Sequence, residues 1–232
     1  MNESGLKKLT ELENLECLIL ENKISLSDES IIAISNNCKE LKRLEIDRCT
    51  IVSCIDSEPL PSSSVLEELS KLQCLEHLNL GFAENLKDST ITAIAKNCKN
   101  LKILNISSSD DITETALVAL TKMKNLQKLD VSCLDIITDS FLIKLKGLKE
   151  LNCSECDKLT NAGVIKFIKN NPDLELLDVR YIDNITIDMM IGADQATENR
   201  TNGIILQIYS DSPSIAHASK STIKSQWLVV TC

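Results

Sequence analysis

The sequence is poor in aromatic residues, glycine, proline and histidine. Of 232 residues, 3% are aromatic, and there are 6 glycines, 4 prolines and 2 histidines. So little glycine and proline argues against an all-β sandwich, which needs a turn about every ten residues. The two histidines, His77 and His217, provide little material for acid–base chemistry. We therefore expect no catalytic residue, no metal site and no cofactor.

Positive charge is also scarce. The sequence has 25 lysines and arginines against 34 aspartates and glutamates, which gives a formal net charge of −9. Nucleic-acid binding rewards basic faces and stacking aromatic rings, and this sequence offers neither. We therefore expect no nucleic-acid partner.

Long apolar runs are missing as well. No stretch approaches the roughly 18 apolar residues of a membrane-spanning helix, and residues 1–8 show no signal peptide. The 10 cysteines are too few for a small secreted disulfide scaffold. We expect an intracellular protein, cytoplasmic or nuclear, with no membrane contact and with its cysteines as thiols.

What the sequence does contain is a repeat. The pattern L-x-x-L-x-[LIVC] occurs seven times, with its first leucine at positions 15, 41, 75, 101, 126, 148 and 174. The spacings are 26, 34, 26, 25, 22 and 26 residues. The segment 206–208 resembles a degenerate eighth copy. Self-similarity at such a period is typical of solenoid proteins.

Each repeat combines two kinds of pattern. The leucine cores alternate apolar and polar residues, as a short strand with one buried face does. Between the cores, for example in 28–38 and 88–98, apolar residues fall three and four apart, which is helix spacing. These segments open with Ser or Thr followed closely by Asp, Glu or Asn, which predicts N-caps. Each repeat is therefore predicted to be one strand, one turn and one helix.

Units of this size bury their apolar faces only by stacking. We predict an open arc of parallel strands with helices outside it. A closed eight-stranded (β/α) barrel is the rival and is less favoured, because that fold needs no fixed leucine template.

The stretch 86–106, with Cys98, and the stretch 24–49, with Cys38 and Cys49, resemble the cysteine-containing leucine-rich repeat. This subtype is typical of F-box/leucine-rich-repeat proteins, and the likeness covers roughly residues 6–209. It implies an α/β leucine-rich-repeat solenoid, a right-handed β-α horseshoe with strands on the concave face and helices on the convex face. The helix-end cysteine position differs in the other copies, which hold Leu12, Leu72, Met123, Leu145 and Asn171.

The predicted domain organisation is a repeat domain at 1–209 and a Ser-rich C-terminal tail at 210–232. Residues 227–230 form either a capping strand or part of that tail. Between Cys49 and Leu75 one repeat is eight residues longer (34 − 26), with the extra material near 54–64. This insertion is either a partner-contacting loop or a tolerated surface insertion.

Polar strand positions should form columns on the concave face, because neighbouring strands lie about 4.8 Å apart. Short side chains rich in acceptors would suit a basic or hydrogen-bonding peptide segment, although a merely solvated sheet face is the alternative. The predicted partner-binding residues are Arg43, Glu45, His77, Asn79, Asn105, Lys128, Asp130, Asn152, Asp178 and Arg180.

Cys153 and Cys156 have the C-x-x-C spacing of half a zinc site or a redox motif. No second such pair exists, and Cys153 takes a leucine-core position, so we expect buried thiols instead. The disfavoured alternative is a thiol or metal enzyme, whose chemistry would depend on this pair.

The resemblance implies a protein-interaction module that recognises substrates for an SCF-type ubiquitin ligase. No F-box-like helical segment precedes the first repeat, so attachment to a cullin scaffold is not expected from this stretch itself. The alternative is an F-box-less regulator or inhibitor, resembling antagonists of mitotic exit or ribonuclease-inhibitor-like proteins, with no ligase role.

Overall fold

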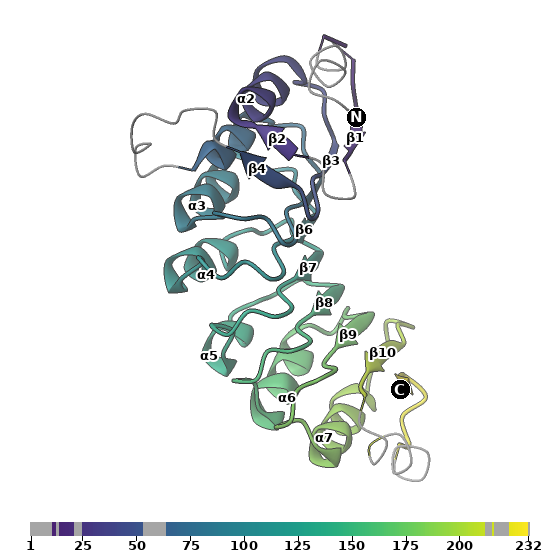
Figure 1. The fold of residues 1–232 in the computed structure, drawn as a ribbon. Coiled ribbons are helices and arrows are strands. Elements are labelled where there is room, and N and C mark those ends of the chain that lie inside the picture. Colours follow the sequence, from purple (N-terminus) through teal and green to yellow (C-terminus); the bar gives the residue numbers. More distant parts are fainter. Residues whose placement is uncertain are drawn as a thin grey trace. The chain divides into compact units, whose positions relative to one another are not determined.

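The computed structural model describes residues 11–12, 14–20, 25–52, 64–211, 215 and 223–231. The chain divides into two compact units, Met1–Asn125 (unit 1) and Leu126–Cys232 (unit 2). Within each unit a layer of short parallel strands lies beside a layer of helices, and the chain alternates between the two layers (Figure 1).

The described residues of unit 1 form four strands in one sheet, and each pairs in parallel with the next. In order they are β1 (Cys17–Ile19), β3 (Arg43–Glu45), β5 (His77–Asn79) and β6 (Ile103–Asn105). A separate two-stranded sheet joins β2 (Ser25–Ser27) to β4 (Thr50–Val52). The helical layer contains α2 (Asp28–Asn37), the 3-10 helix η1 (Val65–Lys71), α3 (Asp88–Asn97) and α4 (Glu114–Leu120).

Unit 2 repeats this plan. Its sheet strands are β7 (Lys128–Asp130), β8 (Glu150–Asn152), β9 (Leu176–Asp178), β10 (Leu206–Tyr209) and β11 (Leu228–Thr231). Its helices are α5 (Asp139–Leu142), α6 (Asn161–Asn170) and α7 (Ile187–Thr197). Of the segment 227–230, for which the sequence allows a strand or a tail, residues 228–230 lie in β11, which pairs in parallel with β10, and Trp227 precedes it. The domain boundary at residue 209 stays a prediction.

The second leucine of each repeat is the centre of the core. Leu44 pairs with Leu78, and Leu78 pairs with Leu104, in the sheet of unit 1. All three side chains are at most 1% exposed. In unit 2, Leu151 and Leu177 are paired in the same way and fully buried. Neither unit closes its sheet on itself, which confirms the predicted open stack of strand–helix repeats and excludes the closed barrel.

Most helix starts follow the predicted capping chemistry. Ser27 Oγ accepts from the backbone N–H of Ser30 at the start of α2, and Thr160 Oγ1 accepts from that of Gly163 at the start of α6. Two helices differ: the N-cap of α3 is Lys87, and Thr138 at the N-cap of α5 makes no side-chain cap bond either.

Two predicted features lie largely or wholly outside the described residues. The insertion at 54–64 is described only at Ser64, which caps η1. His217 is not described. Among the helices that are described, none is long and apolar enough to cross a membrane.

Candidate functional site: the strand face and its turns

The solvent-side positions of the strands, hereafter the strand face, hold all of the predicted binding residues except Arg180, which follows β9. In unit 1, Arg43 is paired with His77, and Glu45 with Asn79. The Glu45 carboxylate accepts a 2.7 Å hydrogen bond from Arg43 Nε, and its Oε1 lies 3.5 Å from His77 Nε2. The Glu45 side chain is only 12% exposed, whereas that of Arg43 is 47% exposed. The three residues therefore form one cluster in which the arginine is the accessible group.

Asn79 and Asn105 close the turns that follow their strands. Each Oδ1 accepts a 2.9 Å hydrogen bond from the backbone N–H two residues further on, that of Gly81 or Ser107. This arrangement is an Asx turn, in which the side chain replaces a backbone acceptor. Both asparagines are half-buried, and the side-chain oxygen of each already accepts a hydrogen bond from its own turn.

Unit 2 uses the same turn with more hydrogen bonds. Asp130 Oδ1 accepts from the backbone N–H and the hydroxyl of Ser132, at 3.0 and 2.7 Å. Asn152 Oδ1 accepts in the same way from Ser154, at 3.1 and 2.9 Å. Asn152 Nδ2 also donates to Asp130 Oδ2 at 2.9 Å. The two neighbouring turns are thus joined into one network.

Asp178 is the most buried of the predicted site residues, with 5% exposure. It accepts from the backbone N–H of Arg180 at 3.1 Å and from Arg180 Nη2 at 2.6 Å. The hydrogen bond and the negative charge of Asp178 raise the pKa of Arg180. The guanidinium also lies 5.8 Å from the ring centre of Tyr209. On the neighbouring strands of unit 2, Lys128 Nζ and Glu150 Oε1 are 2.6 Å apart.

The Asn and Asp column is thus less free than the sequence suggested. We expected side chains exposed to a partner, but the structure places them half-buried or buried and bound to their own turns. The repeated spacing of an Asn or Asp two residues before a small or basic residue is the signal that could have revealed this. The predicted cations Arg43, Lys128 and Arg180 keep more of their surface accessible, and the binding role of all ten residues stays a prediction.

Sequence reasoning missed a second row, the rim residues, which lie four positions after the second leucine. All have positive φ, between 53° and 60°. They are Arg48, Phe82 and Ser108 in unit 1, and Cys133, Glu155 and Tyr181 in unit 2. The fold fixes this geometry, since for example Phe82 N–H donates to the carbonyl of Ser107 in the next repeat at 2.9 Å. A left-handed backbone costs a bulky residue about 1–2 kcal/mol.

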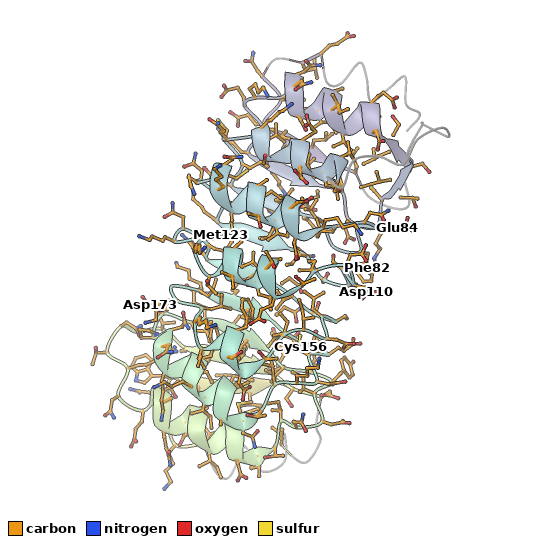
Figure 2. The ribbon with its side chains drawn as sticks, turned by 90° about the vertical axis from the view of Figure 1, so that its left-hand side faces the viewer. Phe82, Glu84, Asp110, Met123, Cys156 and Asp173 are labelled. Carbon is orange, nitrogen blue, oxygen red and sulfur yellow. The ribbon has the colours of Figure 1, made fainter. Side chains whose placement is uncertain are left out.

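Phe82 and Tyr181 are nevertheless large and exposed, at 45% and 57%. The Arg48 guanidinium lies 4.7 Å from the centre of the Phe82 ring. Figure 2 shows Phe82 on the same side of the molecule as Glu84 and Asp110. The signal in the sequence was that an aromatic residue occupies an aligned repeat position in a chain with very few aromatics.

The C-x-x-C pair is part of the core. Cys153 and Cys156 are both fully buried, and their thiols donate to the backbone carbonyls of Asp178 and Val131, each at 3.3 Å (Cys156 is labelled in Figure 2). Burial raises the pKa of Cys156 to about 12 and that of Cys153 well above its usual value. Both groups are therefore neutral thiols that are poor metal ligands and poor nucleophiles. Among the described residues, no group of three or more His, Cys, Asp or Glu side chains could hold a metal ion.

No known family model matches the sequence. Among solved structures, the chain is similar to an internalin (inlF) from Listeria monocytogenes, with a TM-score of 0.56, 16% identity, and coverage of 100% of this chain and 73% of that one. It is also similar to internalin C2 (inlC2) from the same organism, with a TM-score of 0.51, 19% identity, and coverage of 88% and 74%. The fold is a leucine-rich-repeat fold.

A weaker likeness is to the structure of the yeast Rad7 and Elc1 complex. Its TM-score is 0.46 at 14% identity, with coverage of 98% of this chain and 77% of that one. At that TM-score the likeness supports no inference about this chain.

Proposed function

We propose that this chain is a protein-interaction module that binds a protein partner and catalyses no reaction. The observation that carries the proposal is an exposed aromatic rim residue in each unit, Phe82 in unit 1 and Tyr181 in unit 2. Aromatic and arginine side chains dominate the energetic centres of protein interfaces. Neither ring is needed to fill the core, and both occupy a backbone position that disfavours bulky residues.

The strand face supports the same proposal. Its side chains are held by strands and turns, so they lose little further conformational entropy when a partner binds. Its charges are mixed, since Arg43 lies beside Glu45 and Lys128 beside Glu150, and Asp178 is paired with Arg180 just after β9. A matching partner presents mixed polar groups, with carboxylates for the accessible cations, and binds more weakly as salt screens the exposed charges.

In finer terms, we propose substrate recognition for an SCF-type ubiquitin ligase. The proposal rests on the resemblance to F-box/leucine-rich-repeat proteins. Cys38 and Cys98, buried at the ends of α2 and α3, are consistent with the cysteine-containing subtype. The alternative is a leucine-rich-repeat regulator or inhibitor with no ligase role. Cysteines without a disulfide suit a reducing compartment and hence a cytoplasmic or nuclear location, and the structure describes six of them as free: Cys17, Cys38, Cys74, Cys98, Cys153 and Cys156.

Affinity capture with the immobilised chain tests these proposals, with a Phe82→Asn and Tyr181→Asn double variant in parallel. Asparagine tolerates the left-handed backbone, so the variant removes the rings and keeps the turns. We expect a partner that the original chain captures and the variant loses. Cullin scaffold subunits among the captured proteins support the ligase proposal. A direct partner without any cullin supports the regulator, and equal capture by both chains contradicts the role of the rim.

A further inference from the structure

Unit 1 has a hollow of about 290 Å³ at the ends of its last two helices. One wall comes from the end of α3 and the residues after it, with Ala95, Cys98, Lys99 and Leu101. The other wall is the segment 122–125, which follows α4. Figure 2 shows Met123, in that second wall, on the opposite side from Phe82, so the hollow is separate from the rim.

The hollow exists because α4 is short. Cys98 and Met123 hold equivalent positions, each three residues before the first leucine of a repeat. Helix α3 continues to the residue before Cys98, whereas α4 stops at Leu120 and the chain reaches Met123 through a tight turn, with Met123 N–H bonded to the Leu120 carbonyl. Asn125 Nδ2 donates to the Lys99 carbonyl at 2.8 Å and ties the two walls together.

The hollow has an uncharged floor. Leu101 is 1% exposed and Cys98 is 2% exposed. Burial raises the pKa of Cys98 to about 11, so its thiol is neutral. Met123 is half-buried and flexible in shape, which suits contact with an apolar guest. The volume is at the lower end of the range for ligand pockets, so it fits one side chain better than a cofactor.

The border of the hollow is positive. Elsewhere in the described part of unit 1, Lys42, Lys71, Lys87 and Lys102 each pair with a carboxylate, and only Lys39 and Lys96 do not. At the hollow, Lys99 Nζ donates to the Ala95 carbonyl, and neither Lys99, Lys122 nor Lys124 has a carboxylate partner within the described part of the chain. The chain as a whole has a net charge of −9, but these lysines are available to pair with a negatively charged ligand.

We propose that this hollow binds an acidic segment of a partner protein. One apolar side chain of the segment enters the hollow, and flanking carboxylates pair with Lys99, Lys122 and Lys124. The proposal rests on the proposed role as a protein-interaction module. It adds a second contact surface to the one expected at the strand face.

A random-peptide display library selected on the full chain tests this directly. The test variant is Lys122→Glu with Lys124→Glu. The matched control is Lys144→Glu with Lys146→Glu, because these exposed lysines have the same positions relative to the next repeat in unit 2. Thermal melting of both variants shows that the fold is kept.

We expect enriched peptides with Asp or Glu around one apolar residue. Their affinity should fall by about tenfold or more for the test variant and little for the control. The affinity should also fall when the apolar residue of the peptide is replaced by glycine.

The proposal is overturned by no enriched peptide, by an equal loss in test variant and control, by binding that survives the glycine replacement, or by displacement of the peptide by inorganic phosphate alone. The last two results would indicate a general anion site. Peptides that depend on Phe82 but not on Lys122 and Lys124 overturn the hollow and leave the proposed function standing.

Discussion

The ends of α3 and α6 hold the same position in their repeats but use different chemistry. Cys98 and Asn171 each follow their helix directly and lie three residues before a core leucine. The Cys98 thiol donates to the Leu72 carbonyl at 3.5 Å, and Asn171 Nδ2 donates to the Leu145 carbonyl at 3.1 Å. Leu72 and Leu145 are themselves equivalent positions of the preceding repeats. A thiol and an amide thus satisfy the same kind of carbonyl.

Asn171 makes more side-chain hydrogen bonds than Cys98 because the repeat before it is shorter. That repeat spans 22 residues (148 − 126), and its helix α5 has only four residues. In unit 1, Leu75 N–H bonds to the Leu72 carbonyl, whereas the equivalent Leu148 N–H donates to Asn171 Oδ1 at 3.2 Å. Asn171 also donates to the Phe167 carbonyl at 2.9 Å. A shortened repeat is therefore tolerated where a buried amide replaces the missing turn bond.

A core leucine sets the scale for this comparison. Leu78 is fully buried between two paired strands of unit 1, so Leu78→Ala should lower the free energy of unfolding by about 2–5 kcal/mol. Leu18, in the end strand β1 and 5% exposed, should lose less on the same change. Urea unfolding of both variants measures this. Equal losses would count against a stack that is weaker at its end.

Removal of the buried Asn171 amide should cause the second largest loss of unfolding free energy. Asn171→Leu keeps an apolar side chain at the helix end but leaves the carbonyls of Leu145 and Phe167 and the N–H of Leu148 without this partner. At 1–3 kcal/mol for each buried unsatisfied group, we expect a loss of about 3 kcal/mol or more in urea unfolding. A loss below about 1 kcal/mol would show that the short repeat does not depend on Asn171.

Removal of the Cys98 thiol, in the same position of its repeat, should cause a smaller loss of stability. Cys98→Ala removes a small buried side chain and a weak hydrogen bond, so the expected loss is about 1–2 kcal/mol. The same urea experiment measures it. A loss as large as that of Asn171→Leu would remove the proposed difference between the two helix ends.

Alkaline pH should reveal the buried thiol. Burial raises the pKa of Cys98 from its ordinary value of 9.0 to about 11 in the folded chain. Its contribution to stability is present below pH 9 and is lost as the pH rises from there through about 11. Between pH 8 and pH 10, the original chain should lose about 1 kcal/mol more than Cys98→Ala. Identical losses in the two chains would mean that this thiol is not buried.

The repeat could be predicted from the sequence because the spacing of the leucines alone indicates that they are buried. Leu44, Leu78 and Leu104 needed only the spacing and the apolar–polar alternation to be placed in the core. Cys153 was placed there too, because it takes a leucine position. These properties are local, so a single sequence carries them.

The remaining features depend on hydrogen-bond partners, and the spacing of the repeats does not predict these partners. Asn79 and Asn105 looked like free side chains, because nothing in a residue's identity says that the N–H two positions later uses its oxygen. The left-handed backbone at Phe82 follows from a hydrogen bond to the next repeat. Asn171 looked like a lost cysteine, and its role depends on the length of the repeat before it.

Different side chains stabilise the fold and bind the partner, and two variants measured side by side test this separation. Phe82→Asn should leave the unfolding free energy unchanged or raise it, while affinity for the captured partner falls by about tenfold. Asn105→Ala should lower the unfolding free energy by about 1 kcal/mol, because Ser107 N–H loses its acceptor. If Phe82→Asn destabilises the chain and leaves partner affinity intact, the claim is contradicted.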